Sequence, residues 1–181
     1  MNDAPTPKPD AGLSALIELL RKKSSEPCEE TAAMLRDDLP APVHALLKAI
    51  ADHGIYVDLA GTAGGFELTT PEALEDHNAV DEISEHLVTY AIVADDVVNL
   101  GSTGGGEEQL LVGWNAEGYR VFRWEYGEEA LHLYESFAAF FVYLRNYLAE
   151  KCECDRDALA DSDLETLLVR LDEWDTYWAA V

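Results

Sequence analysis

A glycine-rich segment is the part of this sequence whose spacing comes closest to a known chemical site. Residues 101–108 read GSTGGGEE, and Gly101 and Gly106 stand at the spacing of a phosphate-binding loop. That loop needs a lysine after its second glycine, whereas here Glu107 would repel a phosphate. The segment also precedes a predicted strand, whereas a phosphate-binding loop opens a helix whose N-terminal amides bind the anion. We interpret it as a loop between strands.

An acidic segment further along offers carboxylates at spacings that suit a cation. Its aspartates are Asp155, Asp157, Asp161 and Asp163. Counted from Asp155, an EF-hand needs a turn glycine at its sixth position and a bidentate acid at its twelfth, where this sequence has Ala160 and Thr166. We therefore interpret the segment as a solvated acidic linker and predict no metal site.

Cysteine and histidine form no pattern for metal binding or nucleophilic catalysis. The three cysteines are Cys28, Cys152 and Cys154, an odd number that indicates free thiols. The Cys-x-Cys pair has neither a second pair nor a nearby histidine to complete a zinc site. No two of the five histidines lie four residues apart, and no serine lies in a Gly-x-Ser-x-Gly elbow. The sequence predicts no catalytic residue and no cofactor.

Acidic residues dominate the composition. The 181 residues include 36 Asp and Glu against 12 Lys and Arg, for a net charge of -24. This charge repels nucleic acid and anionic membranes and would attract a basic protein. The longest uncharged apolar stretches, 87–94 and 136–144, are less than half of the roughly 20 residues that cross a bilayer. No basic-then-apolar leader opens the sequence, so we expect a cytoplasmic protein. Adaptation of the whole surface to high salt stays open as a second explanation of the charge.

Three acidic pairs fall in predicted loops or at predicted strand ends, where they could line one rim of the molecule. The pairs are Asp95 with Asp96, Glu107 with Glu108, and Glu128 with Glu129. We predict that these residues contact a basic partner. Trp114 is a candidate exposed anchor, because aromatic side chains dominate interface energetics. Its alternative role is that of a core tryptophan at a strand end.

Helix patterns come first along the chain. Residues 1–12, with three prolines, predict a flexible tail, and residues 13–38 a helical arm. A helix follows over 42–53, where Pro42 suits its first position and Gly54 its end. Strands are predicted over 55–59 and 66–68. Thr70 then has the character of an N-cap for another helix that Pro71 opens.

In the next part of the chain, apolar residues recur at every second position. This period of two predicts an antiparallel meander with strands over 88–92, 97–100, 110–114 and 119–126. In its last strand Phe122, Trp124 and Tyr126 share one face, which we predict to be the core side. Ser136 is a predicted cap for a helix that covers the sheet. In the remaining segment, 151–181, an acidic linker precedes an amphipathic helix that we expect to pack on the core. This helix starts with the capping box Ser162-x-x-Glu165 and ends near Trp174 and Trp178. The element order predicts an α+β fold whose antiparallel or mixed sheet has about five to six strands flanked by helices.

Residues 39–150 form the predicted core, and most of them resemble the SUKH superfamily of Smi/Knr-type cell-wall-assembly and bacterial toxin-immunity proteins. The matching segments over 39–148 are LPAPVHALLKAIADHG, GTAGGFELTTPEAL, YAIVADDVVNLGSTGGGEEQLLVGW, GYRVFRWEY and ESFAAFFVYLRNYL. The chain departs from the family pattern where Asp52-His53-Gly54 replaces the commoner Asn-Gly, and in its helical extensions at both ends. These departures leave the subfamily and the partner open.

The resemblance implies a non-catalytic role, because bacterial members are antidotes that bind and block polymorphic toxins, many of them nucleases or deaminases. An acidic antidote could imitate the phosphate backbone that such a toxin binds, and long-range attraction would speed its association. A regulatory or scaffolding adaptor of the same fold is the alternative, in which the stripe with Trp174 and Trp178 would bind a partner or a second copy. An unrecognised hydrolase is a third possibility.

Overall fold

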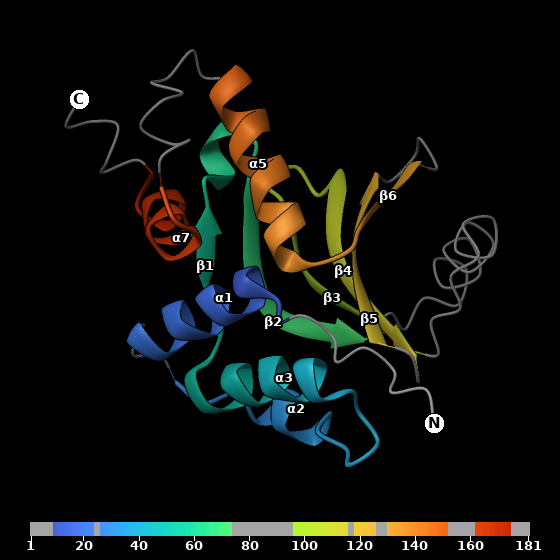
Figure 1. Cartoon of the computed structure of the whole chain (residues 1–181). Coiled ribbons are helices and arrows are strands. Elements are labelled where there is room, and N and C mark those ends of the chain that lie inside the picture. Colours follow the sequence, from blue (N-terminus) through green and yellow to red (C-terminus); the bar gives the residue numbers. More distant parts are fainter. Residues whose placement is uncertain are drawn as a thin grey trace, which may run out of the picture.

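One antiparallel sheet and five helices make up the described part of the chain (Figure 1). This computed structural model describes residues 9–23, 26–73, 96–115, 118–125, 130–151 and 162–174. The strands are β1 (Val57–Leu59), β2 (Phe66–Ala73), β3 (Asp96–Thr103), β4 (Glu108–Asn115), β5 (Gly118–Glu125) and β6 (Ala130–Tyr134). They follow the order β1-β2-β3-β4-β5-β6, and every pairing between neighbours is antiparallel. The predicted α+β fold is confirmed.

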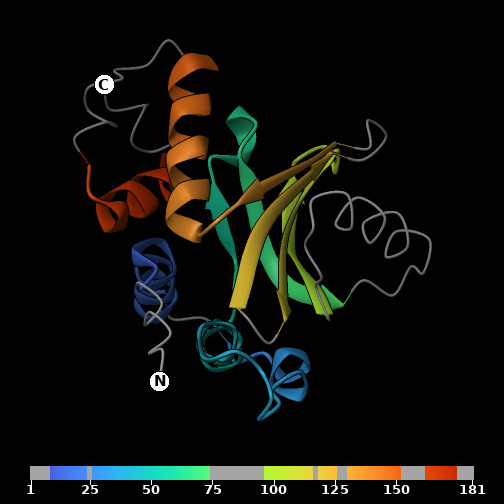
Figure 2. The same ribbon diagram turned by 45° about the vertical axis from the view of Figure 1, so that its right-hand side comes forward.

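The helices lie on one face and at one end of this sheet, as Figure 2 shows. They are α1 (Ala11–Lys22), α2 (Glu29–Ala33), α3 (Ala41–His53), α5 (Phe137–Lys151) and α7 (Leu164–Asp172), with the short 3-10 helix η1 (Gly61–Ala63) after β1. Helix α5 crosses the face of the sheet with α1 and α7 beside it, and α2 and α3 lie at the end. The predicted Ser136 cap is present, since its hydroxyl accepts a hydrogen bond from Ala139 N at 3.1 Å.

The main hydrophobic core lies between the sheet and the helices. Its fully buried side chains include Leu16 and Leu20 of α1, Ile50 of α3, Leu68 of β2, Leu110 of β4, Phe140 and Leu144 of α5, and Leu167 of α7. The Phe140 ring meets the rings of Phe66 and Tyr134 edge-on, each with a centroid distance of 5.5 Å. Since α1 and α7 bury their apolar faces here, both terminal helices belong to the same core as the central segment.

The predicted flexible tail and helical arm need a correction at their boundary. Ala11 and Gly12, assigned to the tail, form the first turn of α1, and the Asp10 carboxylate caps it by accepting from Gly12 N at 2.9 Å. Gly12 lies against α5 so closely that a Cβ on it would stand 2.2 Å from Ala138 N. Only glycine permits this approach, which brings the two helix starts together.

Strand β2 is longer than predicted and replaces the helix expected at Thr70 and Pro71. Both residues lie within β2, whose register with β3 shifts between Leu68 and Glu72. A proline is tolerated at such an irregularity because it removes no regular ladder hydrogen bond there. At the other side of this pairing, Gly101 has φ 152°, and a Cβ on it would meet Glu67 O at 2.0 Å. The strand predicted over 88–92 lies outside the described residues.

The far face of the sheet holds a second, smaller cluster. Phe122 and Trp124 are buried in it together with Leu111 and Leu131. The prediction that Phe122 and Trp124 face the main core is therefore wrong. Val121, the residue before Phe122, points to the helix-facing side, so Phe122 and Trp124 point to the opposite side. Tyr126, predicted on the same side, lies outside the described residues.

Helix α7 begins one residue later than the predicted capping box. Asp163, not Ser162, is its N-cap and accepts from Thr166 N at 2.8 Å. Glu165 is not a reciprocal cap, since it forms an ion pair with Lys22 of α1. Trp174, just beyond α7, is 8% exposed in the main core, whereas Trp178 lies outside the described residues. Across the described ranges, no helix has both the length and the apolar character needed to cross a membrane.

Candidate protein-interaction site

The antiparallel order of the sheet divides the acidic residues that were predicted to line one rim. Asp96 pairs with Trp114 in the register of β3 and β4, whereas Glu108 begins β4 and pairs with Glu125. Glu108 and Trp114 are six positions apart along β4, which corresponds to roughly 20 Å. Asp96 therefore lies at the opposite end of the sheet from Glu107 and Glu108, and the single rim is wrong.

The remaining acidic pairs are described only in part. Asp95, Glu128 and Glu129 lie outside the described residues, as does the side chain of Asp96. Glu107 and Glu108 lie where β3 turns into β4, and we call this end of the sheet the acidic end. The glycine-rich segment forms this turn, with Gly106 N donating to Thr103 O at 2.7 Å. Its interpretation as a loop between strands agrees with this geometry.

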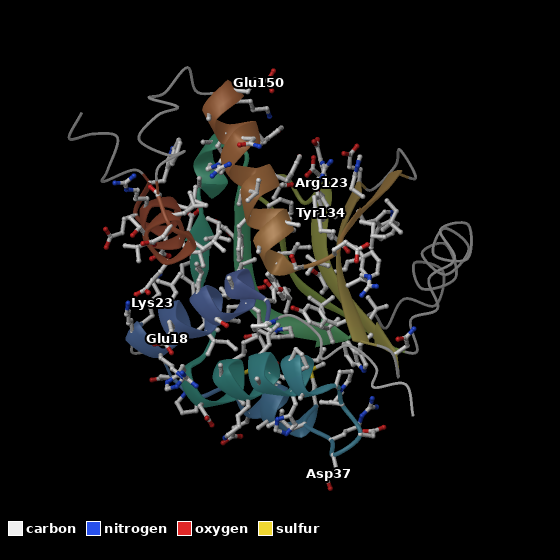
Figure 3. All side chains as sticks on the ribbon, in the orientation of Figure 1. Glu18, Lys23, Asp37, Arg123, Tyr134 and Glu150 are labelled. Carbon is white, nitrogen blue, oxygen red and sulfur yellow. The ribbon has the colours of Figure 1, made fainter. Side chains whose placement is uncertain are left out.

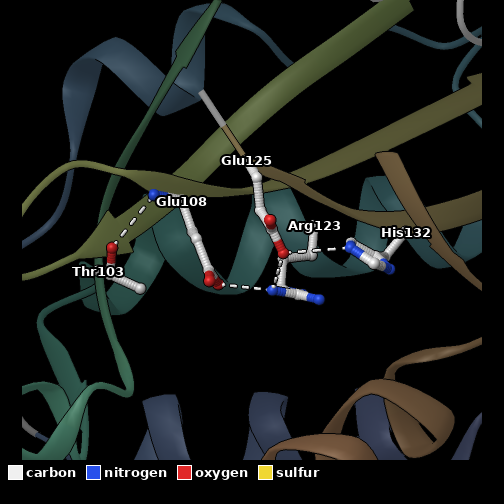
Figure 4. Close-up of polar contacts among 5 residues, drawn as sticks. All are labelled: Thr103, Glu108, Arg123, Glu125 and His132. Carbon is white, nitrogen blue, oxygen red and sulfur yellow. Dashed lines mark hydrogen bonds and ion pairs between the residues drawn. The ribbon is translucent and has the colours of Figure 1, made fainter. Parts of the chain in front are cut away.

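The two glutamates of this turn differ in their surroundings. Glu107 is exposed to solvent. The backbone N–H of Glu108 donates to Thr103 Oγ1 at 3.2 Å, and this bond holds the start of β4 (Figure 4). The Glu108 side chain is 23% exposed and points along the helix-facing side of the sheet toward β5. Glu107 therefore contributes charge to solvent, whereas Glu108 has a fixed position.

Arg123 of β5 fixes two carboxylates at the acidic end. Its side chain is only 7% exposed, and its Nη1 lies 3.0 Å from Glu108 Oε2 and 2.6 Å from Glu125 Oε1. Burial disfavours the charged guanidinium, but hydrogen bonds with Glu108 and Tyr134 outweigh burial and raise the pKa of Arg123. The arginine is therefore charged at every physiological pH. We call Glu108, Arg123 and Glu125 the Arg123 cluster.

Tyrosine rings from α5 and β6 enclose the inner side of the Arg123 cluster. The guanidinium carbon lies 4.8 Å from the centre of the Tyr143 ring, a cation–π arrangement. The Tyr143 centroid is 5.4 Å from that of Tyr134 and 5.8 Å from that of Tyr147. Burial raises the pKa of Tyr143 to about 12 and raises that of Tyr134, so these rings stay neutral. A neutral aromatic wall lowers the local polarity and strengthens the ion pairs of Arg123.

His132 of β6 completes the row that Figure 4 shows. Its Nε2 lies 3.1 Å from Glu125 Oε1, and its side chain is 44% exposed. The two carboxylates of the Arg123 cluster exceed its single cation by one charge. Glu107 adds a further negative charge at the same end. The acidic end can thus attract a cation from solvent, and carboxylate oxygens have lone pairs beyond those that Arg123 uses.

A pocket of about 1250 Å³ lies at the other end of the sheet, between α1, α3 and the β4–β5 end. Trp114 and Tyr119 line it, as do Arg120 and Glu135, whose Nε and Oε2 atoms are 3.4 Å apart. Trp114 is 7% exposed and belongs to the main core. Its role as an exposed anchor is therefore wrong, and the alternative role of a core tryptophan is the one observed.

Sequence reasoning missed Arg123, Glu125 and the tyrosines around them. One signal was present, since Arg123 stands between Phe122 and Trp124 in an apolar strand of an acidic chain. A charged residue at a buried strand position needs an opposite charge nearby. The period of two places Arg123 and Glu125 on one face, but Tyr143 comes to them only through the packing of α5.

No protein-family model, curated protein or solved structure matches this chain. Within the described ranges, no group of three His, Cys, Asp or Glu side chains is arranged to hold a metal ion. The resemblance to SUKH proteins therefore depends on the motif order over 39–148.

Proposed function

We propose that this protein is a non-catalytic cytoplasmic binding protein that neutralises a basic protein, as immunity proteins of the SUKH superfamily neutralise polymorphic toxins. The observation that supports this function most is the pair of carboxylates that one buried arginine holds in place. Glu108 and Glu125 lie at one end of the six-stranded sheet, where Arg123 binds both carboxylates. A binding surface of this kind needs no rearrangement to meet a cationic partner.

Preorganisation is the physical advantage of this arrangement. A solvent-exposed glutamate must give up side-chain freedom when it forms an ion pair, and that loss offsets much of the attraction. Glu108 and Glu125 have already lost this freedom to Arg123, so a partner's lysine or arginine would gain more of the Coulomb energy. The low-polarity tyrosine wall around Arg123 increases that gain.

The net charge of -24 supports the same function at longer range. Acidic surfaces steer basic partners and raise association rates to as much as about 10⁸–10⁹ M⁻¹s⁻¹ at low salt. A toxin that binds nucleic acid presents a basic cleft, and an acidic end of fixed geometry would occupy it in place of phosphates. We propose that the partner is such a basic toxin domain.

Titration of the toxin domain encoded beside this chain tests the proposal. We expect stoichiometric protein to abolish toxin activity, with an affinity that falls as salt concentration rises. The variant Glu107→Gln/Glu125→Gln should weaken binding by about tenfold or more, since two charges leave the acidic end. Its matched control is Asp37→Asn/Glu173→Gln, which changes the net charge equally at exposed positions away from that end, as Figure 3 shows for Asp37.

Two results would contradict the proposal. One is full toxin activity in the presence of excess protein. The other is an equal loss of affinity in the two double variants, because that would assign the attraction to net charge alone. The thermal midpoint of each variant must be measured alongside, so that unfolding is not taken for lost binding.

A further inference from the structure

The two edge strands of the sheet, β1 and β6, differ in length and in what contacts them. At one edge β1 has three residues, and Ala60 N directly after it donates to Leu171 O of α7 at 2.9 Å. At the other edge β6 has five residues and pairs with β5, and no second strand pairs with β6 within the described ranges. Alternate residues of β6 therefore direct their N–H and C=O groups away from the sheet. An open edge of this kind is a template for another strand.

Both signs of charge lie beside β6, with carboxylates in excess at its start. On the neighbouring β5, Arg123 stands opposite His132 in the strand register, and Arg120 Nε is 3.4 Å from Glu135 Oε2. At the start of β6, Ala130 pairs with Glu125 of the Arg123 cluster, whose two carboxylates exceed its one cation. The segment from Glu125 to Glu135 contains four glutamates and neither lysine nor arginine. Natural edge strands are commonly protected by lysine, by proline or by a covering element, and β6 has neither of these residues within its bounds. The side chain of Glu135, directly after β6, is 76% exposed. Within the described ranges the edge is thus open in its backbone, and its start borders the excess of carboxylates at the acidic end.

The two faces of β6 offer different contacts. His132 lies on the helix-facing side next to Glu125, at 3.1 Å. Leu131 lies on the far face, where it is buried, and Leu133 packs half-buried against the same cluster. A strand added outside β6 would therefore place alternate side chains beside His132, whose ring contacts the Glu125 carboxylate, and beside apolar surface.

We propose that the open edge of β6 pairs with an extended basic segment of the partner, in which lysine or arginine alternates with apolar residues. The cationic side chains lie on the helix-facing side near Glu125 and His132, and the apolar ones lie over Leu131 and Leu133. This inference depends on the proposed function for the basic character of the partner and adds to it the edge, the backbone pairing and the alternating pattern.

A second copy of this chain is the competing occupant, and charge disfavours it. Two chains that pair through β6 would each bring a net charge of -24 and the glutamates around β6 to the same interface. Like charges placed together across an interface oppose association. A basic strand meets the same backbone groups with attraction instead.

Amide hydrogen exchange with two synthetic peptides tests the pairing. One peptide alternates lysine and valine, and the control has the same composition with all lysines before all valines. We expect the alternating peptide to slow exchange of the outward-facing amides in Ala130–Tyr134 by about tenfold, because each new backbone hydrogen bond stabilises the complex by about 1 kcal/mol. Equal protection by the two peptides would mean attraction by charge alone and would overturn the proposal. So would protection confined to other strands.

Two histidine-to-lysine variants, one at the edge and one away from it, test whether the occupant of the edge is basic. His132→Lys adds a cation at the edge while it keeps a partner for Glu125, and it should weaken binding of the alternating peptide by about tenfold. The control His53→Lys makes the same change at the end of α3, where a cation is compatible with the helix dipole. It should leave binding unchanged. Equal effects of the two variants would contradict the proposed edge.

The outcomes separate this inference from the proposed function. If the toxin domain is inhibited and exchange in Ala130–Tyr134 does not change on binding, the edge pairing is wrong and the proposed function stands. If the toxin domain is not bound and the alternating peptide still protects β6, the proposed function is wrong and the edge pairing stands. Sedimentation should show a monomer, and a dimer whose formation slows exchange of the amides in Ala130–Tyr134 would identify a second copy as the occupant and overturn the proposal.

Discussion

The carboxylate of Asp10 accepts a hydrogen bond from the backbone N–H of Phe137, 127 positions later in the chain and 2.7 Å away. The same side chain accepts from Ala138 N at 3.1 Å and from Gly12 N at 2.9 Å. One carboxylate therefore caps the N-termini of α1 and α5 together, and its negative charge suits the positive ends of both helix dipoles. The hydroxyl of Tyr119 donates to the same carboxylate.

Loss of this shared cap should destabilise the whole fold. We expect Asp10→Ala to lower the free energy of unfolding by about 3 kcal/mol, since it removes one capping acceptor shared by two helix N-termini and leaves the Tyr119 hydroxyl without this acceptor. Urea denaturation followed by circular dichroism measures the change. Asp37→Ala, at an exposed site, is the control and should stay within about 0.5 kcal/mol of the wild type. Equal stabilities of the two variants would show that the cap has no role.

Close contact between α1 and α5 makes Gly12 intolerant of a side chain. A Cβ there would stand 2.2 Å from Ala138 N and 2.5 Å from Phe137 C, both backbone atoms. We expect Gly12→Ala to lower the free energy of unfolding by about 3 kcal/mol, because the helices must move apart. Gly104→Ala is the control, since its Cβ would meet only Gly61 O at 3.7 Å. A thermal melt of Gly12→Ala that matches the wild type would contradict this packing.

Removal of Arg123 should leave two carboxylates without their cation. We expect Arg123→Met to lower the free energy of unfolding by about 2 kcal/mol, although methionine fills much of the same volume. Adding Glu108→Gln and Glu125→Gln should restore part of the loss, because neutral amides repel each other less than carboxylates do. Denaturant titration of the single and triple variants measures this coupling. Additive effects of the three substitutions would disprove the cluster.

Alkaline pH should weaken the fold through Tyr119. Burial and then the hydrogen bond to Asp10 raise the pKa of Tyr119 above its ordinary value of 10.0, with a smaller opposing effect from Arg120. The folded protein thus favours the neutral phenol, so this stabilisation is complete below pH 10 and is lost as pH rises above it. Thermal midpoints measured from pH 8 to 11 should fall more steeply for the wild type than for Tyr119→Phe. Parallel curves would show that Tyr119 does not contribute.

The sequence alone was enough for those features that depend on local rules. The period of two predicted three of the strands, β3, β4 and β5, and Pro42 with Gly54 predicted the extent of α3. Ser136 was recognised as a cap because its hydroxyl bonds an amide only three residues away. The order of these elements was sufficient for the α+β class, since strands that follow one another by short turns pair antiparallel.

Only the tertiary structure decided what depends on distant parts of the chain. The alternation of residues along a strand indicates that Phe122 and Trp124 share a face of the sheet. It does not indicate which face meets α5, because that depends on how the helices pack. The acidic end follows from strand register, which separates Asp96 from Glu108 although both looked like members of one rim. The caps of Asp10 on α5 and the ring of Tyr143 over Arg123 join residues that only folding brings together, because no local pattern encodes a contact between distant segments.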